Sequence, residues 1–134
     1  MKSSIFLKAT VALQAMMIIG VNAKTLEGPY LGQETPGLES DVFAPGVVST
    51  EHRDSSVFFS PDMKSMYFTR RDNITKNWVL ITYTQENDVW RKASEEPRIG
   101  RPFMSPDGSI MHLGKRYKER TESGWSEVKS LGPW

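Results

Sequence analysis

Residues 58–70 read Phe-Phe-Ser-Pro-Asp-Met-Lys-Ser-Met-Tyr-Phe-Thr-Arg, a pattern that predicts a strand, a tight turn and a second strand. The turn is Ser60-Pro61-Asp62, because proline presets φ for the first central turn position and Ser and Asp side chains bond to nearby backbone groups. The flanking residues are rich in aromatic side chains, which strands favour. We therefore predict a β-hairpin here and interpret the rest of the chain around it.

The same pattern occurs again in residues 103–113, Phe-Met-Ser-Pro-Asp-Gly-Ser-Ile-Met-His-Leu. Its turn, Ser105-Pro106-Asp107-Gly108, follows the first by about 45 residues, the length of one four-stranded propeller blade. The spacing divides this part of the chain into two units, residues 55–94 and 95–134. The predicted fold class is all-β, with antiparallel four-stranded blades of a β-propeller, about two blades and incomplete.

Each unit holds short β-prone stretches separated by turns. In the first unit we expect strands at residues 56–59, 65–70, 78–84 and 89–93. In the second unit we expect strands at residues 101–104, 109–115 and 124–131. Residues 116–123 are highly charged and stand where a third strand should be. The second unit is therefore compact, or its third strand is short and polar.

The first 23 residues have the features of a secretory signal peptide. Lys2 and Lys8 precede a mostly apolar run over residues 9–21, and Val21-Asn22-Ala23 offers small residues to a signal peptidase. We expect cleavage after Ala23 and a periplasmic or secreted protein. The alternative is an uncleaved membrane anchor, although the apolar run is short for a membrane span.

Residues 24–54, the N-terminal segment, are rich in Gly, Pro, Ser and Glu, which are typical of turns and loops. Only Val42-Phe43 and residues 47–50 have the pattern of short extended pieces. We expect this segment to wrap onto the core and to supply one edge strand at most. The alternative is a flexible linker, which its large apolar side chains disfavour.

Composition bounds the function. The chain has 134 residues, a net charge of +1, 25% charged residues and no cysteine. This length fits one modest domain, and the near-neutral charge gives no global field that would favour nucleic acid or an anionic membrane. The lack of cysteine excludes disulfides, thiolate metal sites and a cysteine nucleophile.

Few residues suggest catalysis or metal binding. Ser60, Asp62, Ser105 and Asp107 could form catalytic pairs, but their position in Ser-Pro-Asp turns favours a structural role. His52 and His112 are the only histidines, and they lack the spacing of a metalloprotease motif. No nucleophile elbow, phosphate-binding loop or dinucleotide fingerprint is present. The sequence therefore predicts no catalytic residue, no cofactor and no metal.

Two basic pairs follow the equivalent second strands of the two units, Arg70 with Arg71 and Lys115 with Arg116. Their functional interpretation is a contact surface for an anionic partner, such as a polysaccharide or a protein. The sequence favours the other interpretation, a pair of solvated loops, because Glu119, Glu122 and Glu127 interrupt the positive charge nearby.

The chain resembles the WD40-like β-propeller repeat proteins of bacteria, whose repeats also form the propeller of TolB-type periplasmic proteins. The resemblance rests on Phe59-Ser60-Pro61-Asp62-Met63-Lys64, Met66-Tyr67-Phe68 and Met104-Ser105-Pro106-Asp107-Gly108-Ser109. It implies that Ser60, Pro61, Asp62, Ser105, Pro106, Asp107 and Gly108 are structural motif residues. Tyr30-Leu31-Gly32-Gln33 and residues 43–49 are similar to the leading part of some exported members.

The chain departs from this family in two respects. Met63 stands where the family, like the second turn with Gly108, has glycine, so a positive φ there would add strain of about 1 kcal/mol. In addition, a closed propeller needs at least four blades. We therefore expect a fragment of a longer protein, whose missing blades close the propeller; assembly between chains and an open pair of sheets are the alternatives.

The resemblance implies an exported module that acts in protein or ligand binding or as a scaffold and is non-catalytic in itself. The ligand would be a protein, a peptide or a glycan, and not a nucleic acid. The alternative is the propeller portion of a larger hydrolase of the serine-peptidase type, whose catalytic domain is absent from this chain.

Overall fold

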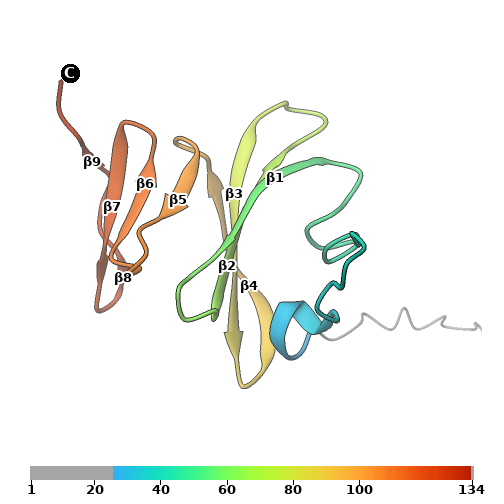
Figure 1. Ribbon diagram of the computed structural model, residues 1–134. Coiled ribbons are helices and arrows are strands. Elements are labelled where there is room, and N and C mark those ends of the chain that lie inside the picture. The colour runs from blue at the N-terminus through green and yellow to red at the C-terminus, as the bar shows by residue number, and fades with distance from the viewer. Residues whose placement is uncertain (1–25, 134) are drawn as a thin grey trace, which may run out of the picture.

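The computed structural model describes residues 26–133, whose regular structure is two antiparallel β-sheets and one short 3-10 helix, Pro29–Gly32 (Figure 1). The all-β prediction is therefore confirmed. The predicted signal peptide, residues 1–23, lies outside the described residues. Within residues 26–133 no helix is long and apolar enough to cross a membrane.

Sheet 1 has the order β1-β2-β3-β4 and is formed by Arg53–Phe59, Ser65–Arg71, Trp78–Glu86 and Val89–Pro97. Sheet 2 has the order β5-β6-β7-β8, and β9 also pairs with β7. Its strands are Pro102–Met104, Ile110–Leu113, Arg116–Thr121, Gly124–Trp125 and Lys129–Ser130. Each strand pairs antiparallel with its neighbours, so each unit is a meander of hairpins.

The second unit differs from the prediction at its end. Residues 124–131 were predicted as one strand, and the structure instead has two short strands, β8 and β9, that both pair with β7. Ser126 lies between them: its amide donates to the Glu119 carbonyl at 2.9 Å, and its hydroxyl accepts from the Glu119 amide at 3.0 Å. The side chain thus replaces a ladder partner and interrupts the strand. The charged stretch before it forms β7, a short polar third strand.

The N-terminal segment covers one face of sheet 1 (Figure 1). Apolar side chains of the segment and of the sheet share one core there: Leu31, Ala44, Val48, Met66, Phe68, Ile81 and Trp90. The segment is fixed to β4, because the Trp90 indole donates to the Gly28 carbonyl at 2.7 Å and the Trp90 amide to Leu26 at 2.7 Å.

The segment contributes a single antiparallel bridge, Glu27 with Val89, to the edge of β4. The prediction that residues 47–50 are extended is wrong. The Ala44 carbonyl accepts hydrogen bonds from the amides of Val47 and Val48, at 3.0 and 2.9 Å, so the chain turns there. Burial of Val48 in the core outweighs the preference of its β-branched side chain for a strand.

Sheet 2 covers the other face of sheet 1. Tyr67 and Leu80 from sheet 1 meet Met111 and Leu113 from sheet 2 in a second core. Consecutive residues of β2 are therefore buried. In a sheet with one solvent-exposed face, buried and exposed residues would alternate along the strand. Lys118 and Glu96 form an ion pair of 3.3 Å across the two sheets.

The first Ser-Pro-Asp turn carries backbone strain. Met63 has φ of 58°, close to the 73° of Gly108 in the second turn, so both turns have the same geometry. We expect Met63→Gly to raise the free energy of unfolding by about 0.5–1 kcal/mol, because it removes a left-handed non-glycine residue at some cost in unfolded-state entropy. The Met63 side chain is 45% exposed, so little packing is lost.

Urea unfolding followed by circular dichroism measures this gain as a higher midpoint. Gly108→Ala is the matched control and should lower the midpoint, since its Cβ would occupy a left-handed position 3.3 Å from Pro61 Cδ. If Met63→Gly leaves the urea midpoint unchanged, the backbone at Met63 is not strained.

Candidate functional site

The two Ser-Pro-Asp turns have equivalent hydrogen bonds. The Ser60 hydroxyl donates to Asp62 Oδ1 at 2.5 Å and accepts from the Ser65 amide at 2.9 Å. In the second turn the Ser105 hydroxyl donates to Asp107 Oδ1 at 2.5 Å and accepts from the Ile110 amide at 2.9 Å. Each serine thus joins the turn to the strand that follows it. The hydroxyls and carboxylates are used within the turns.

The turn carboxylates are charged hydrogen-bond acceptors. The Ser105 hydroxyl, the Ser109 amide and the Ser109 hydroxyl lower the pKa of Asp107 to about 2. The Ser60 hydroxyl and the Lys64 amide likewise lower the pKa of Asp62. An acid with a pKa this far below neutral is a poor proton donor at pH 7. The geometry therefore supports a structural role for both residues.

The two turns lie side by side at the same end of the two sheets. A Cβ added at Gly108 would lie 3.3 Å from Pro61 Cδ, so the glycine of one turn faces the proline of the other. A shallow cavity of about 200 Å³ lies between them, and Arg120 lines it together with Asp62 and Asp107. Equivalent parts of the two units are thus brought together.

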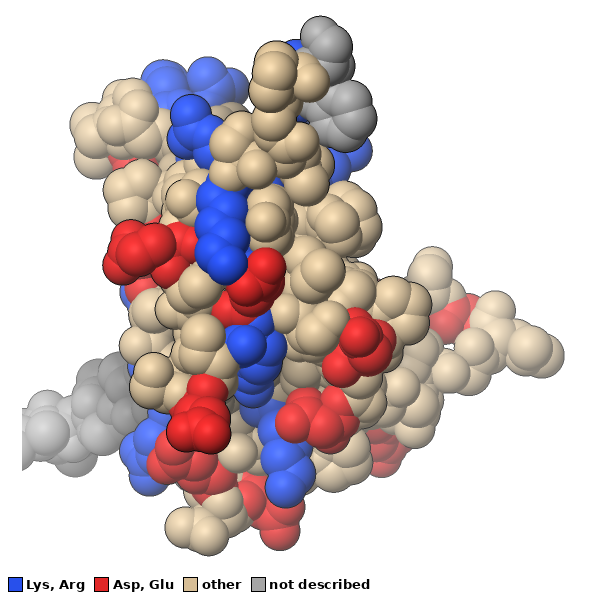
Figure 2. Space-filling view, turned by 90° about the vertical axis from the view of Figure 1, so that its left-hand side faces the viewer, with Lys and Arg blue, Asp and Glu red and all other residues tan. Residues whose placement is uncertain are grey.

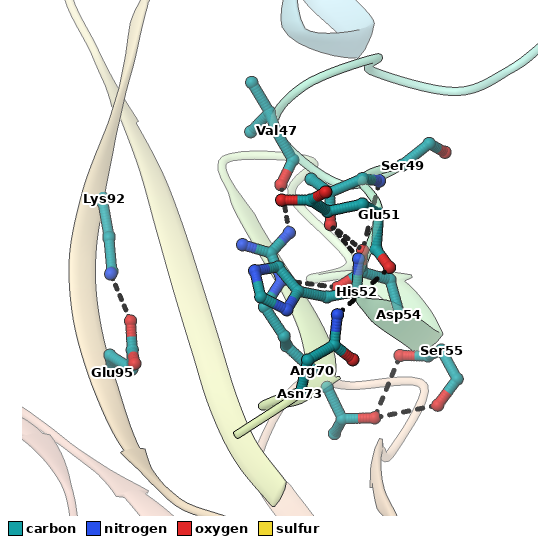
Figure 3. Close-up of polar contacts among 12 residues, drawn as sticks. Val47, Ser49, Glu51, His52, Asp54, Ser55, Arg70, Asn73, Lys92 and Glu95 are labelled. Atoms are coloured by element: carbon teal, nitrogen blue, oxygen red, sulfur yellow. Dashed lines mark hydrogen bonds and ion pairs between the residues drawn. The ribbon is translucent and has the colours of Figure 1, made fainter. Parts of the chain in front are cut away.

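Arg70, predicted to contact an anionic partner, is used inside the fold. Figure 3 shows its guanidinium between the N-terminal segment and the sheet. Arg70 Nε pairs with Asp54 Oδ1 at 2.6 Å, and Nη2 donates to the Val47 carbonyl at 2.8 Å. Even-numbered residues of β2, such as Phe68, face the N-terminal segment. Arg70 shares that face and fastens the segment to β2.

His52 lies close to this ion pair, and Figure 3 shows its imidazole beside Arg70. Thr50 donates its amide and hydroxyl to Asp54 Oδ2 and accepts from the His52 amide at 3.1 Å. His52 Nδ1 is buried and has no hydrogen-bond partner among the described residues. His112 lies in the other sheet, stacked on Phe103. No group of three or more His, Asp or Glu residues within 26–133 is placed to hold a metal.

The other predicted cations lie at the end of the sheets opposite the Ser-Pro-Asp turns. Arg71 is the last residue of β2, whereas Lys115 and Arg116 are at the β6–β7 turn. Further cations gather at the same end. The full group, which we call the basic end, comprises Arg53, Arg71, Lys76, Arg98, Arg101, Lys115 and Arg116. Among residues 26–133, none of these side chains forms an ion pair.

Charge is segregated along the strand direction. In Figure 2, Lys and Arg dominate the upper part of the molecule, whereas the lower half carries most of the Asp and Glu, with Lys and Arg between them. The carboxylate of Asp72 in the loop at the basic end accepts hydrogen bonds from the Ile74 and Thr75 amides and so stays charged. The cations of the basic end outnumber Asp72 and Glu95 beside them, so its net charge is positive.

Trp78 is the centre of the basic end on sheet 1. The register places Arg53, Arg71 and Trp78 in one row across β1, β2 and β3. The Arg98 guanidinium lies 4.3 Å from the Trp78 ring centroid, and Arg53 lies 5.9 Å from it. Stacking on the indole holds these guanidinium groups in place, and within residues 26–133 no hydrogen bond uses their N–H groups, which are therefore available to an anion.

An open recess of about 580 Å³ adjoins this row. Trp78, Lys76 and Arg98 contribute to its wall, together with Asp72 and Glu95. The sequence indicated Arg71, Lys115 and Arg116, but missed Arg53 and Arg98. Their isolated positions in the sequence gave no signal, and only strand register brings them to Trp78.

A scan against protein-family models found no matching family, and searches of curated proteins and of solved structures found no similar protein either.

Proposed function

We propose that this chain is an exported β-propeller repeat module that binds an anionic partner through its basic end and is non-catalytic in itself. The observation that carries the proposal is the convergence of cations from both sheets on one end. Arg71 is the last residue of the second strand of sheet 1, and Arg116 is the first residue of the third strand of sheet 2. Both sheets thus present cations at the same end, which suits a ligand with several negative charges.

The exposure and the stacking of the cations at the basic end support a role in binding rather than in packing. Lys115 and Arg116 are exposed, and Arg53 and Arg98 are ordered against Trp78. An ordered guanidinium loses less conformational entropy on binding than a free one. The leading sequence, residues 1–23, supports export.

Binding of dextran sulfate, with neutral dextran as the reference, tests the proposal by isothermal titration calorimetry. The double variant Lys115→Glu and Arg116→Glu is expected to weaken binding by about tenfold or more at low ionic strength, because two attractive charges become repulsive. Added salt should weaken binding of the unaltered chain in the same direction.

The matched control reverses two exposed cations away from the basic end, Lys64→Glu and Arg91→Glu. It makes the same change in net charge and should alter affinity by about twofold or less if binding is local. Equal losses of affinity in the two double variants would show a non-specific effect of charge. If the unaltered chain does not bind dextran sulfate, the proposal of an anionic partner is overturned.

A further inference from the structure

Sheet 2 has an outer face that the described chain leaves uncovered. Met111 and Leu113 point toward sheet 1, so the residues that alternate with them point away. Phe103, His112 and Tyr117 form a cross-strand row on this outer face. Phe103 is 55% exposed, although its ring stacks on His112 at a centroid distance of 4.6 Å.

Sheet 1 has a corresponding stacked pair of rings at the equivalent positions. Phe58 precedes the first turn as Phe103 precedes the second, and Tyr67 corresponds to His112. The Phe58 and Tyr67 rings are stacked at 5.0 Å with an interplanar angle of 11°, the same angle as in the second pair. Tyr67, however, is only 3% exposed, because sheet 2 packs on it.

The face of sheet 2 that covers Tyr67 also has an equivalent in sheet 1. Sheet 2 contacts Tyr67 with Met111 and Leu113. Their equivalents in sheet 1 are Met66 and Phe68, which are buried under the N-terminal segment. Each sheet therefore has one face that presents a methionine and a large apolar side chain, and one face that presents a pair of stacked rings. In the stack of two sheets, the N-terminal segment covers the Met66 face of sheet 1, whereas the Phe103 face of sheet 2 is uncovered.

We propose that the outer face of sheet 2 is the docking surface for a third antiparallel sheet built on the same Ser-Pro-Asp plan. The third sheet covers Phe103 and His112 as Met111 and Leu113 cover Tyr67. A second copy of this chain does not supply it, since both of its methionine faces are already buried, under the N-terminal segment and against sheet 1. This inference concerns another surface than the basic end and does not depend on the anionic partner.

Polar side chains at the border of the face fit the same arrangement. Glu119 and Lys129 lie on the outer side of sheet 2 and pair with each other at 2.5 Å, each nearly half exposed. The existing sheet–sheet contact also has a charged pair, Lys118 with Glu96. A third sheet would meet an apolar centre with a charged border, the usual composition of a protein interface.

The test extends the full chain at its C-terminus by a second copy of its residues 98–133. Reaction of histidines with diethyl pyrocarbonate, mapped by peptide mass spectrometry, is the readout. We expect the modification rate of the original His112 to fall about tenfold or more, because the added sheet covers it. The corresponding histidine of the added copy should stay reactive, and His52 serves as an internal reference.

The matched control carries Met111→Asp and Leu113→Asp in the added copy alone, and it should leave the original His112 as reactive as in the unextended chain. Equal reactivity of His112 in the extended and unextended chains would overturn the proposal. So would self-association of the unextended chain that Phe103→Glu abolishes in sedimentation velocity, because a second copy would then be the occupant.

Discussion

Replacing Phe68 by alanine is expected to lower the free energy of unfolding by about 3–5 kcal/mol. The Phe68 side chain is fully buried at 0% exposure and lies in the core between β2, β3 and the N-terminal segment. It stacks on Tyr83 at a centroid distance of 6.2 Å, and the Arg70 guanidinium lies 5.3 Å from its ring. Deleting the ring leaves a cavity. The Arg70 side chain cannot move into this cavity, because its ion pair with Asp54 fixes it. Urea unfolding measures the loss.

Phe103→Ala deletes the same atoms from the uncovered outer face of sheet 2 and is the control. In the unextended chain it should change the free energy of unfolding by about 0.5 kcal/mol or less, as is usual for exposed positions. Comparable losses in the two variants would contradict the burial assigned to Phe68 or the exposure assigned to Phe103.

Gly100→Ala is expected to cost about 1–3 kcal/mol, the range for overpacked sites. A Cβ at this position would lie 2.1 Å from the Leu113 carbonyl oxygen and 2.6 Å from its carbonyl carbon. Both contacts are with backbone, so no side chain can move aside. Gly100 is in the connection between sheet 1 and sheet 2, and the strain would fall on the contact of Leu113 with sheet 1.

The control is Gly37→Ala, which adds the same methyl group where no atom lies within 4 Å. It should cause no loss and a gain of up to about 1 kcal/mol through the unfolded chain. Hydrogen exchange distinguishes the mechanism: in Gly100→Ala the amides of β6 should exchange faster, while those of the β2–β3 ladder change less. Equal stability of the two variants would contradict the close approach at Gly100.

The strands of the first unit could be predicted from the sequence because local chemistry specifies them. The Ser-Pro-Asp turns satisfy their own hydrogen bonds through Ser60 and Ser105, so their geometry does not depend on distant residues. The strand prediction failed at residues 124–131, where the Ser126 hydroxyl takes the place of a ladder partner. That bond depends on the position of Glu119 across the hairpin, which composition does not reveal.

The candidate site was predictable only in part. Arg70 and Arg71 are adjacent in sequence, yet successive residues of a strand point to opposite faces. One consequently fastens the N-terminal segment and the other belongs to the basic end. Sequence alone could not decide between them, because both faces of sheet 1 are covered. The association of Arg53 and Arg98 with Trp78 likewise follows from register and not from a motif.

The attachment of the N-terminal segment has a consequence for synthesis. Gly28 accepts hydrogen bonds from Gln85 and Trp90, which follow it by 57 and 62 residues. The segment therefore leaves the ribosome well before its binding surface exists, and closing so long a loop is slow compared with forming a hairpin. A chain cut short before Trp90 lacks the indole that packs in the core with Leu31 and Val48 and holds Gly28. The N-terminal segment therefore reaches its final place only after the last strand of the first sheet has been made.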